Sequence, residues 1–481
     1  MALKRSVWQG GLVGLMLIAL LLPLMALSTS LRPTLVNAAD ETARLRAVHA
    51  VPDIGGPVDV YVGTAPFTVG EAAVPNFDFF TVTPYLTVPV GATDIRIVAA
   101  GGDPNDAEQT LISATVPLEA GQDYSAVARG TATNAEIPPG ATLLTDDNTA
   151  PAIGKAHVRV AHFAPDAPAV DIFVNGERSA ITNLEYLGTS PYVPLDAGTY
   201  TFGVAPTGGD PIYSVDLTLE AGQVVTAWAN GLLGAEAEDD AVLATQAFKV
   251  TPSVDVSYYY LRGVHAFPDV AGTPVDVYVD NTRVATFDFF AATDYLPLVA
   301  GSAYTVSIVP AGGDLGAALI TGPLPDTLMA GNEYSLVAHR PVAPGETSVT
   351  LLTDDNTAPA IGKAHVRVAH FAPDAPAVDI FVNGERSAIT NLEYLGTSPY
   401  VPLDAGTYTF GVAPTGGDPI YSVDLTLEAG QVVTAWANGL LGGENDEVPE
   451  AQAFKVTPTI DRVYAVEAPA QTTVYLPIIA R

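Results

Sequence analysis

The stretch Val158-Arg-Val-Ala-His-Phe-Ala-Pro-Asp-Ala-Pro-Ala-Val-Asp-Ile-Phe-Val-Asn-Gly176 decides how this chain is organised. It recurs without change at residues 366–384, and looser versions stand at 45–62 and 261–279. Each version carries an Arg, a His three residues later, a Pro-Asp pair and a Val-Asp-x-aromatic-Val run. The chain therefore contains four copies of one kind of domain, and each copy opens with this stretch.

The stretch predicts two short strands separated by a turn. Ala164-Pro-Asp-Ala-Pro168 cannot continue a strand, because each Pro lacks an N–H and has a fixed φ. Val170-Asp-Ile-Phe-Val174 then reads as a second strand, and Asn175-Gly176 is a strong turn signal. Side chains alternate between the faces of a strand, so Val170, Ile172 and Val174 are expected on one face.

A polar set surrounds the turn, and two interpretations of it compete. In the functional interpretation, the His and the two Asp residues form a metal or acid–base site. In the structural one, Asp caps a turn through the backbone and His hydrogen-bonds a loop. The structural interpretation is favoured, because an enzyme rarely needs four identical active sites in tandem. The sets are His49/Asp53/Asp59, His162/Asp166/Asp171, His265/Asp269/Asp276 and His370/Asp374/Asp379.

The pattern Arg-Val-x-His-x-x-Pro-Asp-Ala-Pro-x-Val-Asp resembles the opening of the bacterial family called domain of unknown function 4397. The resemblance continues through residues 192–200 and 219–227 and covers the second and fourth copies fully. The first and third copies match more loosely, since Gly55-Gly56 and Ala271-Gly-Thr replace the Ala-Pro spacing. This resemblance implies a secreted or surface β-sandwich, and it supplies no catalytic residues.

Composition limits the classes of function. The chain has 481 residues, of which 48% are hydrophobic, and its net charge is −33. This charge argues against nucleic acid and anionic membrane surfaces as partners, because both require clustered Lys and Arg. The chain has no cysteine, which excludes disulfides, thiolate zinc sites and cysteine catalysis.

The first 39 residues read as an export signal. Lys4 and Arg5 precede an apolar run from Gly10 to Leu27, and Val36-Asn-Ala38 offers small residues for cleavage. An uncleaved membrane anchor is the alternative, since the apolar run is just long enough to span a bilayer. Either outcome predicts an extracellular or cell-surface protein, which contacts the membrane only through this segment if it is not cleaved.

The remaining chain divides into alternating units A and B. Unit A1 covers 43–148, B1 156–252, A2 258–356 and B2 364–458, and a short apolar tail covers 459–481. Thr142–Gly234 is identical to Thr350–Gly442, so the A–B pair is copied as a block. In unit A1, strands are expected at 45–50, 57–62, 76–80, 85–90, 94–100, 110–117, 123–129 and 141–145.

This spacing of short strands and turns predicts the fold class. We expect an all-β chain with four immunoglobulin-like or transthyretin-like antiparallel β-sandwich domains in tandem. Domains in series favour an extended rod. The acidic run Gly234–Asp240 is expected to be an exposed loop. The tail is either an apolar terminal tag or a last strand of unit B2, and its periodicity does not decide between the two.

The best candidate for a cofactor site lies where each A unit joins its B unit. Asp146-Asp147-Asn148 and Asp354-Asp355-Asn356 offer several oxygen ligands of the kind that Ca²⁺ prefers. The alternative is a solvated linker that binds nothing, and it is favoured because short acidic loops are usually solvated. The chain is thus expected to need no cofactor, with Ca²⁺ as the one candidate.

Aromatic residues suggest a second kind of site. The runs Phe77/Phe79/Phe80 and Phe287/Phe289/Phe290 are potential stacking platforms for sugars, but strand alternation favours a core position for the first two of each run. Trp228 and Trp436 lie in strands that are apolar on both faces, so they are also expected in the core.

These observations favour an exported structural or adhesive protein of the cell surface without catalytic activity. Signatures of serine hydrolases, zinc proteases, phosphate loops and dinucleotide-binding folds are missing. One alternative is a module that binds glycans or another envelope polymer, which would be its partner. A second alternative is a hydrolase that uses the His/Asp set.

Overall fold

The computed structural model describes residues 42–234, 245–270, 274–341, 348–442 and 448–465. Almost all regular structure in these ranges is β, with two short 3-10 turns, η2 (Pro268–Val270) and η3 (Leu315–Ala317). No helix in the described ranges is long and apolar enough to cross a membrane. The expected export signal, most of the acidic run 234–240 and residues 466–481 of the tail lie outside the described residues.

Unit A1 is a sandwich of two four-stranded sheets, ordered β4-β1-β7-β8 and β3-β2-β5-β6. Its strands fall close to the positions expected from the sequence. They are β1 (Thr42–His49), β2 (Val58–Gly63), β3 (Val74–Phe77), β4 (Leu86–Pro89), β5 (Gly91–Ala99), β6 (Thr110–Leu118), β7 (Asp123–Arg129) and β8 (Gly140–Asp146).

Units B1 and B2 repeat this plan, with sheet orders β12-β9-β15-β16 and β11-β10-β13-β14 in B1. The strands of B1 are β9 (Lys155–His162), β10 (Val170–Val174), β11 (Glu177–Arg178), β12 (Val193–Asp196), β13 (Gly198–Pro206), β14 (Tyr213–Leu219), β15 (Gln223–Asn230) and the first half of β16 (Lys249–Ala266). Those of B2 are β24 (Lys363–Phe371), β25 (Val378–Val382), β26 (Glu385–Arg386), β27 (Val401–Asp404), β28 (Gly406–Pro414), β29 (Tyr421–Leu427), β30 (Gln431–Asn438) and β31 (Lys455–Val463).

Unit A2 begins with the second half of β16. Its other strands are β17 (Val275–Val279), β18 (Thr282–Phe287), β19 (Leu296–Val299), β20 (Thr305–Pro310), β21 (Ile320–Pro323), β22 (Glu333–His339) and β23 (Val349–Asp354). Each of the four units has its own apolar core between its two sheets. In B1, Val170 and Ile172 of β10 face this core, as strand alternation predicts.

The sheets differ from the expected antiparallel arrangement in one respect. The first strand of every unit pairs in parallel with the next-to-last strand, for example β1 with β7 and β9 with β15. Parallel neighbours require a long crossover connection. The five intervening strands of each unit supply this connection, which no local sequence signal reveals.

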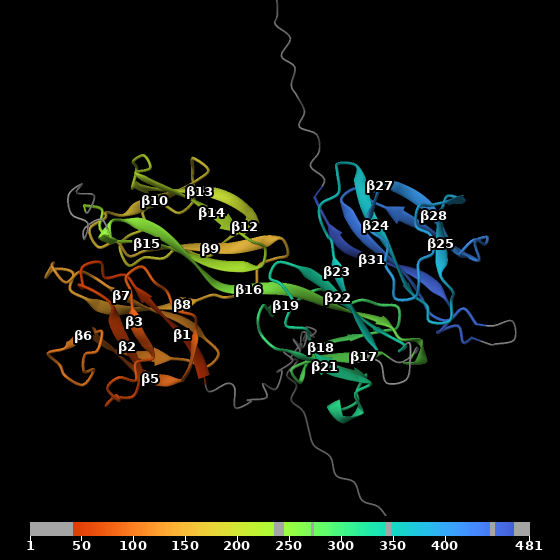
Figure 1. Ribbon diagram of the computed structural model, residues 1–481. Helices are drawn as coiled ribbons and strands as arrows, with labels where there is room; N and C mark the ends of the chain where they lie inside the picture. Colours follow the sequence, from red (N-terminus) through yellow and green to blue (C-terminus); the bar gives the residue numbers. More distant parts are fainter. Residues whose placement is uncertain (1–41, 235–244, 271–273, 342–347, 443–447, 466–481) are drawn as a thin grey trace, which may run out of the picture.

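Strand β16 joins B1 to A2 without a linker. Its first half pairs with β15 of B1, and its second half pairs with β19 and β22 of A2. Figure 1 shows β16 at the centre of the molecule, between the two pairs of units. The expected break between residues 252 and 258 is therefore absent, because the backbone of these residues stays hydrogen-bonded within the sheets.

The units within each A–B pair do not follow one another along a rod. The sheet of A1 that contains β1 and β7 packs on the sheet of B1 that contains β9 and β15, and both contribute to one buried apolar cluster. A2 and B2 share an equivalent cluster. Figure 1 shows the four units as two such pairs side by side. The rod expectation was wrong because each unit has a second apolar sheet face, which only a partner unit can bury.

Candidate functional site

The contact between A1 and B1 contains a buried network of charged and hydroxyl side chains. Arg46 of β1 is 1% exposed and Arg159 of β9 is 3% exposed. Each Arg donates through Nε to a hydroxyl on the neighbouring parallel strand of its own unit, Arg46 to Ser125 at 2.7 Å and Arg159 to Thr226 at 3.0 Å. The parallel pairing sets these contacts, because it places Arg46 beside Ser125 and Arg159 beside Thr226.

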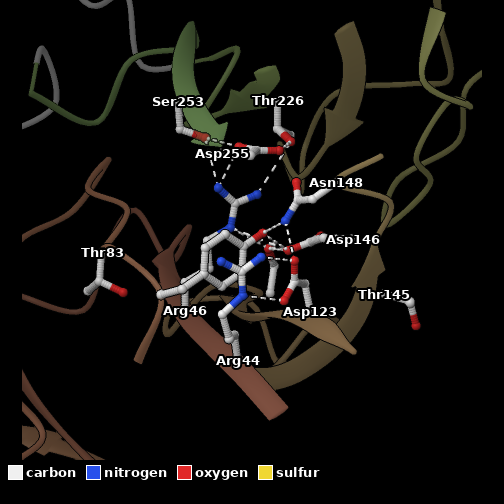
Figure 2. Close-up of polar contacts among 12 residues, drawn as sticks. Arg44, Arg46, Thr83, Asp123, Thr145, Asp146, Asn148, Thr226, Ser253 and Asp255 are labelled. Carbon is white, nitrogen blue, oxygen red and sulfur yellow. Dashed lines mark hydrogen bonds and ion pairs between the residues drawn. The ribbon is translucent and has the colours of Figure 1, made fainter. Parts of the chain in front are cut away.

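The two arginines then reach across the contact to the carboxylate of the opposite unit. Arg46 donates to Asp255 of β16, and Arg159 donates to Asp146 at the end of β8. Figure 2 shows Arg46 reaching Asp255 beside Thr226 and Ser253. Each unit thus gives one Arg and one Asp, so the network is reciprocal, as in a two-fold symmetric interface.

Tyrosine hydroxyls complete the hydrogen bonds of both carboxylates. Tyr85 donates to Asp146 at 2.6 Å, and Tyr192 donates to Asp255 at 3.0 Å. The same rings stack on the arginines, with Arg46 5.0 Å from the centre of the Tyr85 ring. Buried charges are tolerated only when they are paired and hydrogen-bonded. The arginines and carboxylates of this network meet both conditions.

The second pair contains the same network. Arg262 bonds Ser335 at 2.7 Å and Asp461 at 2.7 Å, and Arg367 bonds Thr434 and Asp354. Tyr295 and Tyr400 donate to Asp354 and Asp461, at 2.6 and 3.0 Å. An arrangement that recurs in both pairs and buries its polar atoms is suited to joining units. Little of it is open to a substrate.

Burial and the facing charges set the protonation of this network. Burial opposes the charge of Arg46, but Asp255 and Asp146 outweigh this effect and raise the pKa of Arg46 above its usual value. Burial is also the main cause that raises the pKa of Tyr85, and the negative Asp146 contributes. Tyr85 therefore keeps its proton and remains a hydrogen-bond donor to the carboxylate.

Apolar residues around the network have complementary sizes. B1 contributes Trp228 and Phe163, which are fully buried, and A1 contributes the smaller Val127 and Ala50. Trp228 also donates through its indole N–H to Ser253 at 2.9 Å. The sequence placed Trp228 in the core of its own unit. It is buried as expected, but against the neighbouring unit.

The His residues of the opening stretch lie beneath the turns and contact backbone. In B1, the Nε2 atom of His162 lies 3.0 Å from the carbonyl oxygen of Pro168. His370 makes the same contact with Pro376 in B2. In the A units, His49 and His265 accept a bond from the backbone N–H two residues later and pack against phenylalanine rings. Burial lowers the pKa of His49 and of His265 to about 4.

The Asp residues of the same stretch hold other loops. Asp166 accepts the backbone N–H groups of Leu233 and Gly234, and Asp374 accepts those of Leu441 and Gly442. Asp53 is bonded to residues 131–133, and Asp269 pairs with Arg340. The second Asp in each unit accepts the N–H of the Gly-Gly-Asp turn: Asp59 from Gly101, Asp171 from Gly208, Asp276 from Gly312 and Asp379 from Gly416. The His and Asp side chains of each set thus bond different segments of the chain.

The candidate calcium ligands are not gathered around one point. Asp146 and Asp354 accept bonds from arginines, hydroxyls and tyrosines, as described above. Asp147 bonds Thr149 in its own loop, and Asp355 bonds Thr357. The amide groups of Asn148 and Asn356 donate to Asp123 at 2.7 Å and to Glu333. Within the described ranges, no group of three or more His, Cys, Asp or Glu is placed to hold a metal ion.

Strand alternation predicts the positions of the aromatic side chains only in part. Phe77 is buried in the A1 core, and Phe79 packs on His49. Phe80 has a positive φ of 67° and leaves the strand, so it lies under the Lys249 ammonium group of B1, 3.5 Å from the ring centre. Phe290 and Lys455 form the same contact at 5.4 Å. These rings therefore contribute to the contact between units.

Comparison with protein families supports the fourfold repeat. The family model described as "Domain of unknown function (DUF4397)" matches residues 43–173, 156–253, 259–381 and 364–460. The chain belongs to this family. The DUF4397 matches that begin in A1 and A2 extend into the first strands of the following B unit, so they cross the paired contact. Among curated proteins, none matched the chain.

Solved structures resemble the DUF4397 chain only distantly. The Bacillus anthracis TIE protein matches with 10% identity and a TM-score of 0.14, over 80% of this chain and 68% of that one. The CBMbc module (family CBM26) of Eubacterium rectale, solved with maltoheptaose, matches with 14% identity and a TM-score of 0.15, over 40% and 99% of the two chains. The major pilin subunit BcpA of Bacillus cereus matches with 9% identity and a TM-score of 0.13, over 59% and 99%.

Sequence reasoning singled out Asp146 and Asp354, but as calcium ligands, and it missed the other charged residues that join the DUF4397 units. Arg159 stands between Val158 and Val160, and Asp255 stands in the same way between Val254 and Val256. A charged residue in a buried strand is expected to be paired, and this signal was available. The sequence does not show that each partner lies in the neighbouring unit, because the pairing depends on how the sheets pack.

Proposed function

We propose that this chain is an exported, non-catalytic structural or adhesive protein of the cell surface. One observation carries the proposal: the polar residues most suited to chemistry are used to hold the fold together. The His side chains bond backbone beneath the turns, the Asp side chains clamp loops, and Arg and Asp join neighbouring units. A chain without cysteine can obtain a durable extracellular fold in this way.

Localisation tests the first part of this proposal. Antibodies raised against the folded chain should label intact cells of the source organism without permeabilisation. A deletion strain gives the background signal. Labelling that requires permeabilised cells would contradict surface display. If all the protein were recovered from the culture medium, the protein would be released from the cell and would not have a role on its surface.

A second experiment separates a structural role from glycan binding and hydrolysis. The purified chain is incubated with cell-wall polysaccharides and soluble glucans, and both retention and released products are measured. We expect no released product from the wild-type chain or from His162→Asn. Turnover that disappears in His162→Asn would favour the hydrolase alternative, and saturable retention without turnover would favour a glycan-binding module.

The cofactor question has its own test. We propose that the chain needs no metal, because the hinge carboxylates Asp146 and Asp354 already face arginines. Calcium titration with thermal unfolding should leave the melting temperature unchanged. A rise that saturates with calcium and is lost in Asp147→Asn together with Asp355→Asn would instead place ions at the two hinges.

A further inference from the structure

The contact between the first and second A–B pairs has two different sides. Each side has a second copy elsewhere in the chain that no described residue covers in the same way. On the first pair, the contact uses the linker between A1 and B1. Tyr260 of A2 donates its hydroxyl to the carbonyl of Pro151 at 2.6 Å, and the guanidinium of Arg462 lies against Gly154. Pro151 is consequently buried and Ile153 is half-buried.

The linker of the second pair has the same sequence, but the residues that the structure describes leave it largely uncovered. Ile361, the counterpart of Ile153, is 88% exposed. The Arg462 guanidinium lies 3.5 Å from the point where a Cβ of Gly154 would stand. Among the described residues, no atom lies within 4 Å of the equivalent point at Gly362. We call residues 356–362 the second linker patch.

The other side of the contact shows the same difference. The turn of A2 at Gly331 approaches the turn of B1 at Ala221, whose carbonyl oxygen lies 2.9 Å from the Cβ position of Gly331. The corresponding turn of A1 contains Gly121, and no atom of the described residues lies within 4 Å of its Cβ position. Gln122, next to it, is exposed. Within the described residues, A1 thus presents an uncovered counterpart of the A2 face.

An interface with two different sides does not close on itself, so copies can be added in one direction. We propose that the N-terminal pair of one copy of this chain docks on the second linker patch of another copy. The docking would resemble the way in which the second pair sits on the first, with the strand that begins at Thr42 of one copy meeting the end of β31 of the other in place of the continuous β16. The partner is therefore a second copy of the chain, and the product is a head-to-tail assembly.

The strand geometry supports this continuation. Tyr464 of the second pair donates to the carbonyl of Asn356, as Tyr258 does to Asn148 in the first pair. Both tyrosines also donate their backbone N–H to the turn before the preceding strand of the B unit, Tyr258 to the carbonyl of Gly222 and Tyr464 to that of Gly430. The second pair therefore ends in the conformation that the first pair has where A2 begins. At the proposed junction, Arg44 takes the position of Tyr260 and Val256 takes that of Arg462, so the docking copy brings different side chains to the patch. The Arg44 side chain is 42% exposed and pairs with Asp123.

Sedimentation of the chain without its export segment, over a range of protein concentrations, tests the proposal. We expect a weight-average mass that rises with concentration beyond twice the monomer mass. Ile361→Asp blocks the C-terminal side, and Gln122→Trp blocks the N-terminal side. Both residues are exposed, so the fold should persist. Ile420→Asp is the matched control, because Ile420 is 54% exposed in the adjoining unit B2 but lies outside the patch.

Mixing the two blocked variants distinguishes a head-to-tail contact from other kinds. Each variant alone should remain monomeric, and an equimolar mixture should form dimers but nothing larger, since one intact end of each kind remains. A wild-type chain that stays monomeric at every concentration overturns the proposal. So does self-association that both blocking variants leave unchanged.

The chain's own C-terminal segment is the competing occupant of the patch. A chain that ends at Ala465 decides between the two. Assembly of both the longer chain and this shortened chain supports docking of a second copy. Assembly that occurs only after residues 466–481 are removed assigns the patch to that segment and overturns the proposal. These outcomes are independent of the proposed surface role, because they are measured on purified protein in solution.

Discussion

At the scale of single residues, the reciprocal Arg–Asp pairs are the most distinctive feature of the molecule. Burying a charge is costly, and replacing a buried pair by apolar residues is often neutral or stabilising. The pairs are therefore better understood as a device that selects the correct partner face than as a source of net stability. Packing an apolar face against one of these charges would bury the charge without a partner, which is energetically unfavourable.

Removing one carboxylate should expose this dependence. Asp146→Ala leaves Arg46 and Arg159 buried without their shared partner, and we expect a loss of about 3–5 kcal/mol in the free energy of unfolding. Asp196→Ala is the control, because Asp196 pairs with Lys155 at the surface and should cost below about 1 kcal/mol. Urea unfolding measures both, and equal losses would show that the buried pair has no special role.

The buried histidines of the A units, His49 and His265, predict how stability depends on pH. Their folded pKa of about 4 lies below the ordinary value of 6.5, so the unfolded chain binds protons first as pH falls. Stability is fully present above about pH 6.5 and is lost between there and about pH 4, by up to about 3 kcal/mol for each of His49 and His265. Thermal unfolding between pH 7 and pH 4.5 should show this decline. The double variant His49→Asn, His265→Asn should show a flatter one, and an unchanged slope would contradict the assignment.

At the scale of elements, the contact between the paired sheets depends on complementary sizes. Trp228 on β15 and Val127 on β7 lie in one buried cluster, so two A faces would leave a gap and two B faces would clash. This difference explains how nearly equivalent units pair as A with B.

Exchanging the two side chains tests this explanation. Trp228→Val should cost about 3 kcal/mol by leaving a cavity, and Val127→Trp about 1–3 kcal/mol by overpacking. The double variant should recover part of both losses, with a coupling energy of about 0.5–3 kcal/mol in urea unfolding. Additive losses would mean that the two side chains do not share one space.

The same elements show how far the sequence could be read. Alternation and turn signals placed the strands of A1 within a few residues, because these signals are local. The partner of Trp228 was missed, since a strand that is apolar on both faces looks the same whether its second face meets its own unit or another. The expected boundary between B1 and A2 fell inside β16 because the local sequence does not show that one strand can serve two units. A domain boundary was expected near Pro252 and Ser253, but hydrogen bonds to β15 keep this segment in the sheet.

At the scale of the whole molecule, β16 couples the two pairs more tightly than a linker would. A flexible connection would let the pairs move independently. Here one strand belongs to both sheets, and Tyr258 and Tyr260 on it also bond the linker of the first pair. Relative motion of the pairs would have to break backbone hydrogen bonds and side-chain bonds together.

An insertion in this strand should therefore change the shape of the molecule. Four residues, Gly-Ser-Gly-Ser, placed between Ser257 and Tyr258 interrupt the strand where it passes from B1 to A2. We expect the pairs to separate, with a larger radius of gyration and a broader distance distribution in small-angle scattering, while each pair still unfolds cooperatively. The same insertion between Gly208 and Gly209, in an exposed turn, is the control and should leave the scattering unchanged. Unchanged scattering from the β16 insertion would mean that side-chain contacts across the linker hold the pairs together without the continuous strand.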